Sequence, residues 1–172
     1  MRTLVGSARQ PTLVHFYTAS RTRPQLVERM TRTTHADARA IATASAVAAM
    51  GSWALEACAA QDLSMIAAEE LDHFGVSSVE GWEPSPGGVS LDVMDTLGAV
   101  LHVLSLYEDP VSAMRYAVSL GGDTDTVAAI VGGILSCRQD ALDISWAPQV
   151  ALPPSLEVLA QGLRAMRQAR YA

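Results

Sequence analysis

Apolar residues recur at the spacing of a helix face through most of the chain, which predicts a series of α-helices. A first helix begins at Pro24 and continues over 25–32, because proline favours the first helical position. The longest predicted helix covers 37–60, and its many small residues allow close contact between helices. Residues 62–74 form a shorter helix with one apolar face. The pattern therefore predicts an all-α fold.

The second half of the chain continues this pattern. Its first helix has apolar residues on two sides, which places it in the middle of a helical domain. An Asp-Pro pair marks the start of the next helix, as N-cap and first helical residue. In order, these helices are predicted over 90–107, from Asp109 to Gly121, from Thr124 to about Cys137, and from Pro153 toward Arg170.

One long connection interrupts the helices. Residues 75–88 contain several glycines and prolines, which favour turns. Trp82 and Glu83 lie within this stretch. The sequence leaves two interpretations equally open: a mobile lid over a cleft, or an ordinary connector.

The candidate chemistry lies in the stretch GGDTDT, residues 121–126. Asp123 and Asp125 are two residues apart, and the hydroxyl of Thr126 follows them. Carboxylate and hydroxyl oxygens are hard ligands that suit Mg²⁺, Mn²⁺ or Ca²⁺. The N-terminus of the following helix also favours a bound phosphate.

The same six residues fit a plain helix junction as well. Gly121 and Gly122 can end one helix, and Asp123 or Thr124 can cap the next. On spacing alone, the junction and the metal site both remain open.

Three blocks together resemble the ADP-ribosylglycohydrolase family. GGDTDT followed by AAIVGGI resembles the C-terminal signature of that family, and THADARA at 34–40 is similar to its Thr-His-x-Asp-Pro-Arg-Ala segment. The blocks at 95–97 and 117–120 match the helix pair that leads into GGDTDT. The resemblance covers nearly the whole chain. It implies a compact, orthogonal, all-α domain that spans residues 1–172.

The resemblance also implies a site. Asp123, Asp125 and Thr126 correspond to ligands of a binuclear Mg²⁺ or Mn²⁺ centre, and His35 to a residue beside bound ADP-ribose. Gly121 and Gly122 are expected to contact the same ligand. No residue of this chain is assigned a catalytic role.

Other family motifs are missing. Relatives carry Gly-Asp and Thr-Asp-Asp motifs in an N-terminal half, whereas this chain has no Thr-Asp-Asp and no acidic residue before Glu28. Residues 6–11 resemble a segment that lies mid-chain in relatives. Relatives also often carry an aromatic residue near the position of Asp92. The chain thus resembles the C-terminal half of a family member, N-terminally truncated and with an incomplete metal site.

The implied function is metal-dependent hydrolysis of the N- or O-glycosidic bond between ADP-ribose and a modified target. Three alternatives stay open: an inactive ADP-ribose-binding or regulatory module, a structural remnant, and one half of a split enzyme. The expected partner is ADP-ribose or an ADP-ribosylated substrate. Self-association, or a complementing N-terminal half, is a further possibility.

Charge and hydropathy narrow these expectations. The net charge of −6 argues against nucleic-acid binding. Residues 1–39 nevertheless hold seven arginines and two acidic residues, so the rest of the chain is strongly acidic. The longest uncharged run, 40–55, is too short to span a bilayer. Nothing at the N-terminus resembles a secretory signal, so we expect a cytoplasmic protein without membrane contact.

Overall fold

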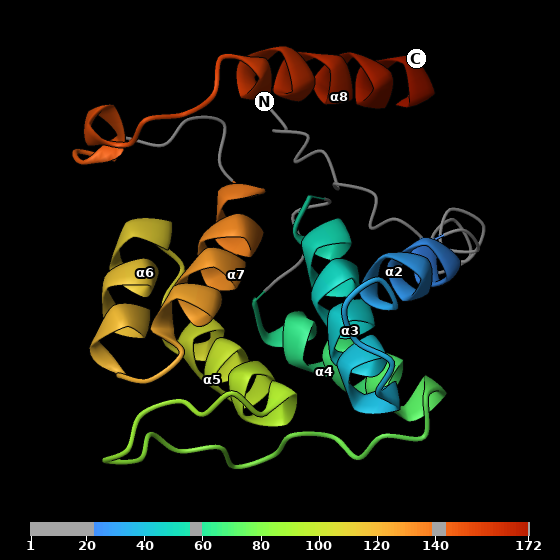
Figure 1. The fold of residues 1–172 in the computed structure, drawn as a ribbon, viewed down its shortest axis with the longest axis vertical. Coiled ribbons are helices and arrows are strands. Elements are labelled where there is room, and N and C mark those ends of the chain that lie inside the picture. The colour runs from blue at the N-terminus through green and yellow to red at the C-terminus, as the bar shows by residue number, and fades with distance from the viewer. Residues whose placement is uncertain (1–22, 56–59, 139–143, 172) are drawn as a thin grey trace, which may run out of the picture. The chain divides into compact units, whose positions relative to one another are not determined.

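The computed structural model of the chain describes residues 23–55, 60–138 and 144–171. The segment 6–11, which resembles a family motif, lies outside these residues. The described part contains helices and no strand, which confirms the all-α prediction (Figure 1). The helices are α2 (Arg23–Thr31), α3 (Ala38–Leu55), α4 (Ala60–His73), α5 (Val93–Leu106), α6 (Pro110–Ser119), α7 (Thr124–Ser136), a short 3₁₀ helix (Ala147–Gln149) and α8 (Ser155–Tyr171).

Contacts divide the chain into two compact units, Met1–Asp140 and Ala141–Ala172, and each is described by itself. That residues 1–172 form one domain stays a prediction. None of the helices in the described part is both long and apolar enough to cross a membrane. The cytoplasmic location likewise stays a prediction.

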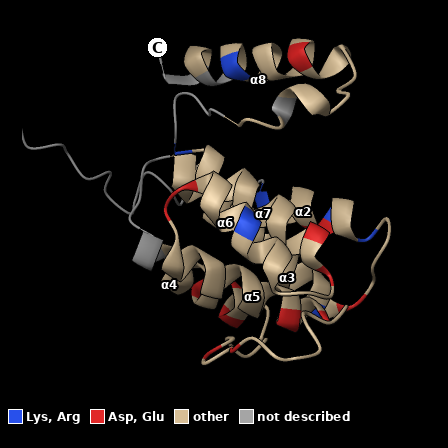
Figure 2. Ribbon diagram, turned by 90° about the vertical axis from the view of Figure 1, so that its left-hand side faces the viewer, with Lys and Arg blue, Asp and Glu red and all other residues tan. Residues whose placement is uncertain are grey.

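In the first unit, α3, α5 and α7 form the centre. α3 packs against α2 and α4, α5 packs against α7, and α6 packs against both α7 and α5 (Figure 1). Most of the ribbon of the first unit is neither acidic nor basic (Figure 2). Each central helix carries a single charged residue, Arg39, Asp95 or Asp125, in its first turn. The rest of these helices is free to pack in an apolar core. Its largest fully buried side chains are Met50, Leu63, Leu71, Leu97, Leu135, Val100, Val103, Val127 and Val131.

Local sequence signals explain where two helices begin. The Asp109 side chain accepts a hydrogen bond of 2.7 Å from the backbone N–H of Ser112, and Pro110 opens α6, as predicted. Asp92 caps α5 in the same way, at 2.8 Å from the N–H of Met94. These backbone donors are the main cause that lowers the pKa of both carboxyls below 3.8.

The connection between α4 and α5 is anchored on α5. Trp82 donates its indole N–H to the carboxylate of Asp95, and its ring lies 5.3 Å from the ring of His102, centroid to centroid. A Cβ atom on Gly98 would lie 2.4 Å from the indole, so only glycine admits this packing. In this structure Trp82 packs on α5.

The second unit consists of the 3₁₀ helix and α8. α8 begins directly after Pro153 and Pro154, close to the predicted start. It carries apolar residues three and four positions apart, which share one helix face. These residues are exposed: Leu156, Leu159, Leu163 and Met166.

Candidate functional site

The turn at 121–126 is held by an isolated parallel bridge to Val89. The N–H of Val89 donates to the carbonyl of Gly121 at 2.9 Å, and the N–H of Asp123 donates to the carbonyl of Val89 at 2.9 Å. A Cβ atom on Gly122 would lie 2.0 Å from the Val89 oxygen, and one on Gly88 would lie 2.4 Å from the Gly121 carbonyl carbon. Glycine at both positions therefore lets the two backbones meet.

Both glycines of the turn have left-handed backbone angles, with φ of 76° at Gly121 and 74° at Gly122. Asp123 then occupies the N-cap position of α7, but its side chain makes no capping hydrogen bond. Instead, its Oδ1 accepts a hydrogen bond of 2.9 Å from the hydroxyl of Thr126. The junction interpretation thus explains the glycines, whereas the Asp123 carboxylate is not used as a cap.

A cavity of about 730 Å³ opens in front of this turn. Asp123 and Thr126 line it together with His35, although His35 belongs to a distant motif. The cavity is bordered by the end of α2, the first half of α3, and the first turns of α5 and α7. Its remaining lining residues are threonines and apolar side chains: Thr31, Ala40, Thr43, Ala44, Val47, Ala48, Leu91, Val93, Thr96, Leu97 and Ile130.

The other predicted site residues do not line this cavity. Asp125 is exposed in the first turn of α7, and the two glycines act through their backbone. In the part of the chain that the structure describes, no three His, Cys, Asp or Glu side chains gather as a metal site would require. Asp123 and Thr126 offer hard oxygen donors to a divalent cation, so they fit part of a Mg²⁺ or Mn²⁺ site. The assignment of Asp125 as a ligand stays a prediction.

His35 sits in the turn between α2 and α3. Its backbone N–H donates to the carbonyl of Thr31 at 2.8 Å, and its Nδ1 lies 2.8 Å from the hydroxyl of Thr34. Nδ1 is therefore engaged within the turn. The Nε2 atom is the ring nitrogen that can contact a ligand in the cavity.

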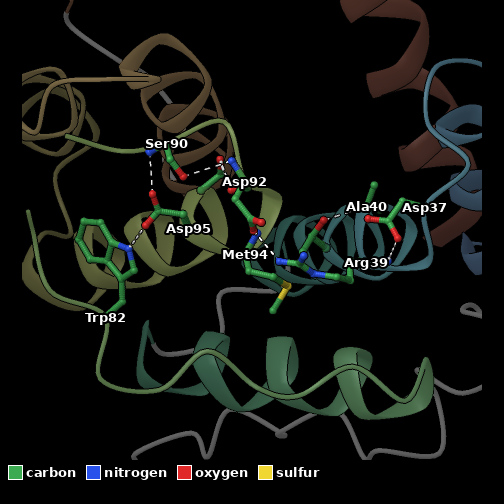
Figure 3. Close-up of polar contacts among 10 residues, drawn as sticks. Asp37, Arg39, Ala40, Trp82, Ser90, Asp92, Met94 and Asp95 are labelled. Carbon is green, nitrogen blue, oxygen red and sulfur yellow. Dashed lines mark hydrogen bonds and ion pairs between the residues drawn. The ribbon is translucent and has the colours of Figure 1, made fainter. Parts of the chain in front are cut away.

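An ion pair that the sequence analysis did not anticipate joins α3 to α5 beside the cavity (Figure 3). Arg39 donates to Asp92 Oδ1 at 2.6 Å, next to the cavity residues Ala40, Leu91 and Val93. Relatives are expected to carry an aromatic residue near Asp92. Here that position holds a carboxylate engaged with an arginine and a helix N-terminus.

Asp95 is a second residue that the sequence analysis did not single out. Besides the indole of Trp82, its carboxylate accepts the backbone N–H of Ser90 at 2.6 Å (Figure 3). The hydrogen bond from Trp82, followed by that from Ser90, lowers the pKa of Asp95 below 3.8. The available sequence signal was the Asp-Thr-Leu block, which shows no partner by itself.

Comparison with known proteins gives a family and no individual relative. The sequence profile of the ADP-ribosylglycohydrolases matches residues 1–172. No curated protein and no solved structure matches the chain. Because the match extends over the whole chain, this protein belongs to the ADP-ribosylglycohydrolase family.

Proposed function

We propose that the cavity binds an ADP-ribosyl group and that the chain takes part in the metal-dependent hydrolysis of its glycosidic bond. One observation carries this proposal. His35 comes from one family-like block and Asp123 and Thr126 from another, and the three side chains line the same cavity. Family membership supplies the chemical class, since hydrolysis of ADP-ribosyl bonds is the activity that gives the family its name.

The walls of the cavity suit a ligand that is partly apolar and partly anionic. The first turns of α5 and α7 border it, and helix N-termini favour negative charge such as that of a pyrophosphate. Apolar side chains, among them Val47, Leu97 and Ile130, provide a surface for the rings. Threonine hydroxyls add donors and acceptors for sugar hydroxyls.

Within this site, the residues have distinct roles. The hydroxyl of Thr126 donates to Asp123 Oδ1, which leaves the second carboxylate oxygen and the lone pairs of the hydroxyl for a cation. When bound, Mg²⁺ or Mn²⁺ would orient the ribose hydroxyls and offset the negative charge of the ligand. Asp125 would add a further carboxylate donor from the same turn. His35 would contact the ADP-ribosyl group through Nε2.

A second candidate is an ADP-ribose-binding module that does not hydrolyse. It is favoured by one observation: of the three predicted metal ligands, only Asp123 and Thr126 line the cavity. Two protein donors leave most of the roughly six ligand positions of Mg²⁺ to water, substrate or other residues. Such a cation would be held weakly.

One experiment tests the proposal and separates its two versions. The purified chain is assayed for ADP-ribose binding by calorimetry, and for release of ADP-ribose from an ADP-ribosylated arginine peptide with Mn²⁺ or Mg²⁺. We expect binding in the wild type and a loss of about tenfold in His35→Ala, equal to about 1.4 kcal/mol. Binding with release supports the hydrolase, and binding without release supports the module.

Matched variants control for general damage to the protein. Asp123→Asn should weaken ADP-ribose binding in the presence of Mn²⁺, because it removes a charge that the cation requires. Asp72→Asn and His73→Ala change exposed residues of α4 that do not line the cavity, and they should bind like the wild type. Equal affinities in His35→Ala and His73→Ala would contradict the proposed site.

A further inference from the structure

Hydrogen bonds made by two neighbouring residues, Val89 and Ser90, connect the turn that carries Asp123 to α5. Asp95 accepts from the backbone N–H of Ser90 at 2.6 Å. The neighbouring residue, Val89, donates to Gly121 and accepts from Asp123, each at 2.9 Å. Because Ser90 and Val89 are neighbours, holding Ser90 in place also holds the backbone of Gly121 and Asp123, on both sides of Gly122.

The same carboxylate also fixes the connector at a second point. Its other oxygen accepts the indole N–H of Trp82 (Figure 3). The indole ring packs on Gly98 and His102. His102 in turn lies 3.2 Å from the hydroxyl of Tyr116, which belongs to α6, the helix that leads into the turn. Asp95 thus holds the connector at two points, Trp82 and Ser90.

The two oxygens of Asp95 have different partners, and both partners are donors. An ionised carboxylate can accept a hydrogen bond at each oxygen, because neither oxygen carries a proton. An asparagine has nearly the same shape, but its amide nitrogen is a donor and cannot accept either hydrogen bond. Asp95→Asn therefore breaks one of the two contacts and changes the volume of the side chain very little.

We propose that Asp95 is a positioning residue for the ligand-binding turn 121–126. It holds Trp82 and Ser90, Ser90 is joined by a peptide bond to Val89, and Val89 holds the backbone of Gly121 and Asp123. Asp95 does not line the cavity, so it acts on the ligand only through this series. The inference rests on the proposed function, because it concerns how the same site keeps its shape.

The test measures the turn and the ligand separately. Amide hydrogen exchange in Asp95→Asn should become faster at the N–H groups of Val89 and Asp123, whereas exchange at Val131, in the middle of α7, stays unchanged. The affinity for ADP-ribose in the presence of Mn²⁺ should fall by about tenfold, the lower end of the loss seen when residues that support metal ligands are changed. A residue that only stabilised the fold would speed exchange everywhere and leave the affinity of the folded protein intact.

Asp109→Asn is the matched control. Asp109 is also a carboxylate that accepts from a backbone N–H at the start of a helix, but it contacts Ser112 and not the connector. We expect wild-type exchange at Val89 and Asp123 and wild-type affinity in this variant. Trp82→Phe is a second test that keeps an aromatic ring in place. It removes the indole donor and part of the ring but leaves the hydrogen bond from Ser90 to Asp95, so its effects at Val89 and Asp123 should have the same direction as those of Asp95→Asn and be smaller.

Three outcomes decide between the claims. Local exchange and affinity that both change in Asp95→Asn support the inference. The inference is overturned if Asp95→Asn leaves the exchange at Val89 and Asp123 unchanged, or if it leaves the affinity for ADP-ribose unchanged. If the wild type binds no ADP-ribose, the proposed function is wrong, and the exchange data alone decide whether Asp95 holds the turn.

Discussion

Gly88 and Gly122 allow the connector and the turn 121–126 to touch through their backbones. Gly122 has a φ of 74° and would place a Cβ atom 2.0 Å from the oxygen of Val89. Side chains other than glycine disfavour that φ by roughly 1–2 kcal/mol even without a clash. The motif GGDTDT therefore combines a glycine that the backbone requires, Gly122, with the carboxylate of Asp123 directly after it.

Gly122→Ala should lower the free energy of unfolding by more than about 1–2 kcal/mol, because the backbone preference and the clash act together. Gly133→Ala is the control, since Gly133 lies within α7 with nothing within 4 Å of an added Cβ. It should raise the free energy of unfolding by roughly 0.5–1 kcal/mol, the usual preference for alanine in a helix. Urea unfolding measures both values. Equal effects would mean that the close approach at Val89 is not formed.

The lowered pKa of Asp95 predicts that the free energy of unfolding depends on pH. Its pKa in the folded protein lies below 3.8, mainly because of the hydrogen bond from Trp82. A carboxyl with a lowered folded pKa contributes stability above its ordinary pKa, and that contribution is lost as the pH falls through the folded value. The difference in unfolding free energy between wild type and Asp95→Asn should thus be constant above about pH 5 and shrink below 3.8. Urea unfolding at pH values from 3 to about 6 measures it. A difference that grows toward acid pH would contradict the hydrogen bonds assigned to Asp95.

At the scale of the helices, the start of α5 combines a cap with a link to α3. The carboxylate of Asp92 accepts from the N–H of Met94 and from Arg39. Both partners of the ion pair are about half exposed, with 47% of each side chain accessible, so the pair is expected to contribute little to stability. The hydrogen bond from Met94 is the largest cause that lowers the pKa of Asp92, followed by the hydrogen bond from Arg39.

Asp92→Asn should therefore be less harmful than Asp92→Ala. Asparagine is a good N-cap residue and keeps the contact with Met94, whereas alanine loses both the cap and the ion pair. Arg39→Gln, which removes only the ion pair, should match Asp92→Asn. Urea unfolding of the three variants gives the order. If Asp92→Asn were as unstable as Asp92→Ala, the ion pair and not the cap would be the main contact.

The sequence predicts the features that depend on neighbouring residues better than the contacts between residues far apart in the chain. The start of α6 at Asp109 and Pro110 depends on neighbouring residues, so it is correct almost to the residue. The break at Gly121 and Gly122 is equally local. By contrast, the contacts between Trp82 and Asp95 and between Arg39 and Asp92 join residues from different elements, and nothing in their spacing reveals them.

The candidate site likewise combines local motifs, which the sequence reveals, with contacts between helices, which it does not. The residues His35, Asp123 and Thr126 could be named from sequence motifs, but the cavity that brings them together depends on how α2, α3, α5 and α7 pack. The same packing leaves Asp125 on the exposed side of the first turn of α7. Asp125 and Thr126 are adjacent in the motif, yet Thr126 lines the cavity and Asp125 does not. The motif alone does not reveal this difference.

The second unit matters at the scale of the whole molecule, because α8 carries an apolar face. Leu159 and Leu163 lie on one face of this helix and expose 60% and 67% of their surface. An exposed apolar stripe of this kind is typical of an association surface. We expect the chain to self-associate in sedimentation experiments as its concentration rises.

The double variant Leu159→Glu with Leu163→Glu should reduce this association. A control with the same added charge, Gln161→Glu with Gln168→Glu, changes the opposite face of α8 and should associate like the wild type. A wild-type chain that stays monomeric at high concentration would show that the stripe is not used by a second copy.

The central claim is that one cavity holds a divalent cation and an ADP-ribosyl group together, with Asp123, Thr126 and His35 in its wall. Calorimetric titration of Mn²⁺ with and without saturating ADP-ribose tests it most directly. A cation reduces the repulsion between the carboxylates and the pyrophosphate, so ADP-ribose should tighten Mn²⁺ binding by about 5- to 150-fold, and Mn²⁺ should tighten ADP-ribose by the same factor. Asp123→Asn should abolish most of this coupling, and Asp125→Asn should reduce it if Asp125 is a ligand. Equal Mn²⁺ affinities with and without ADP-ribose in the wild type would contradict the claim.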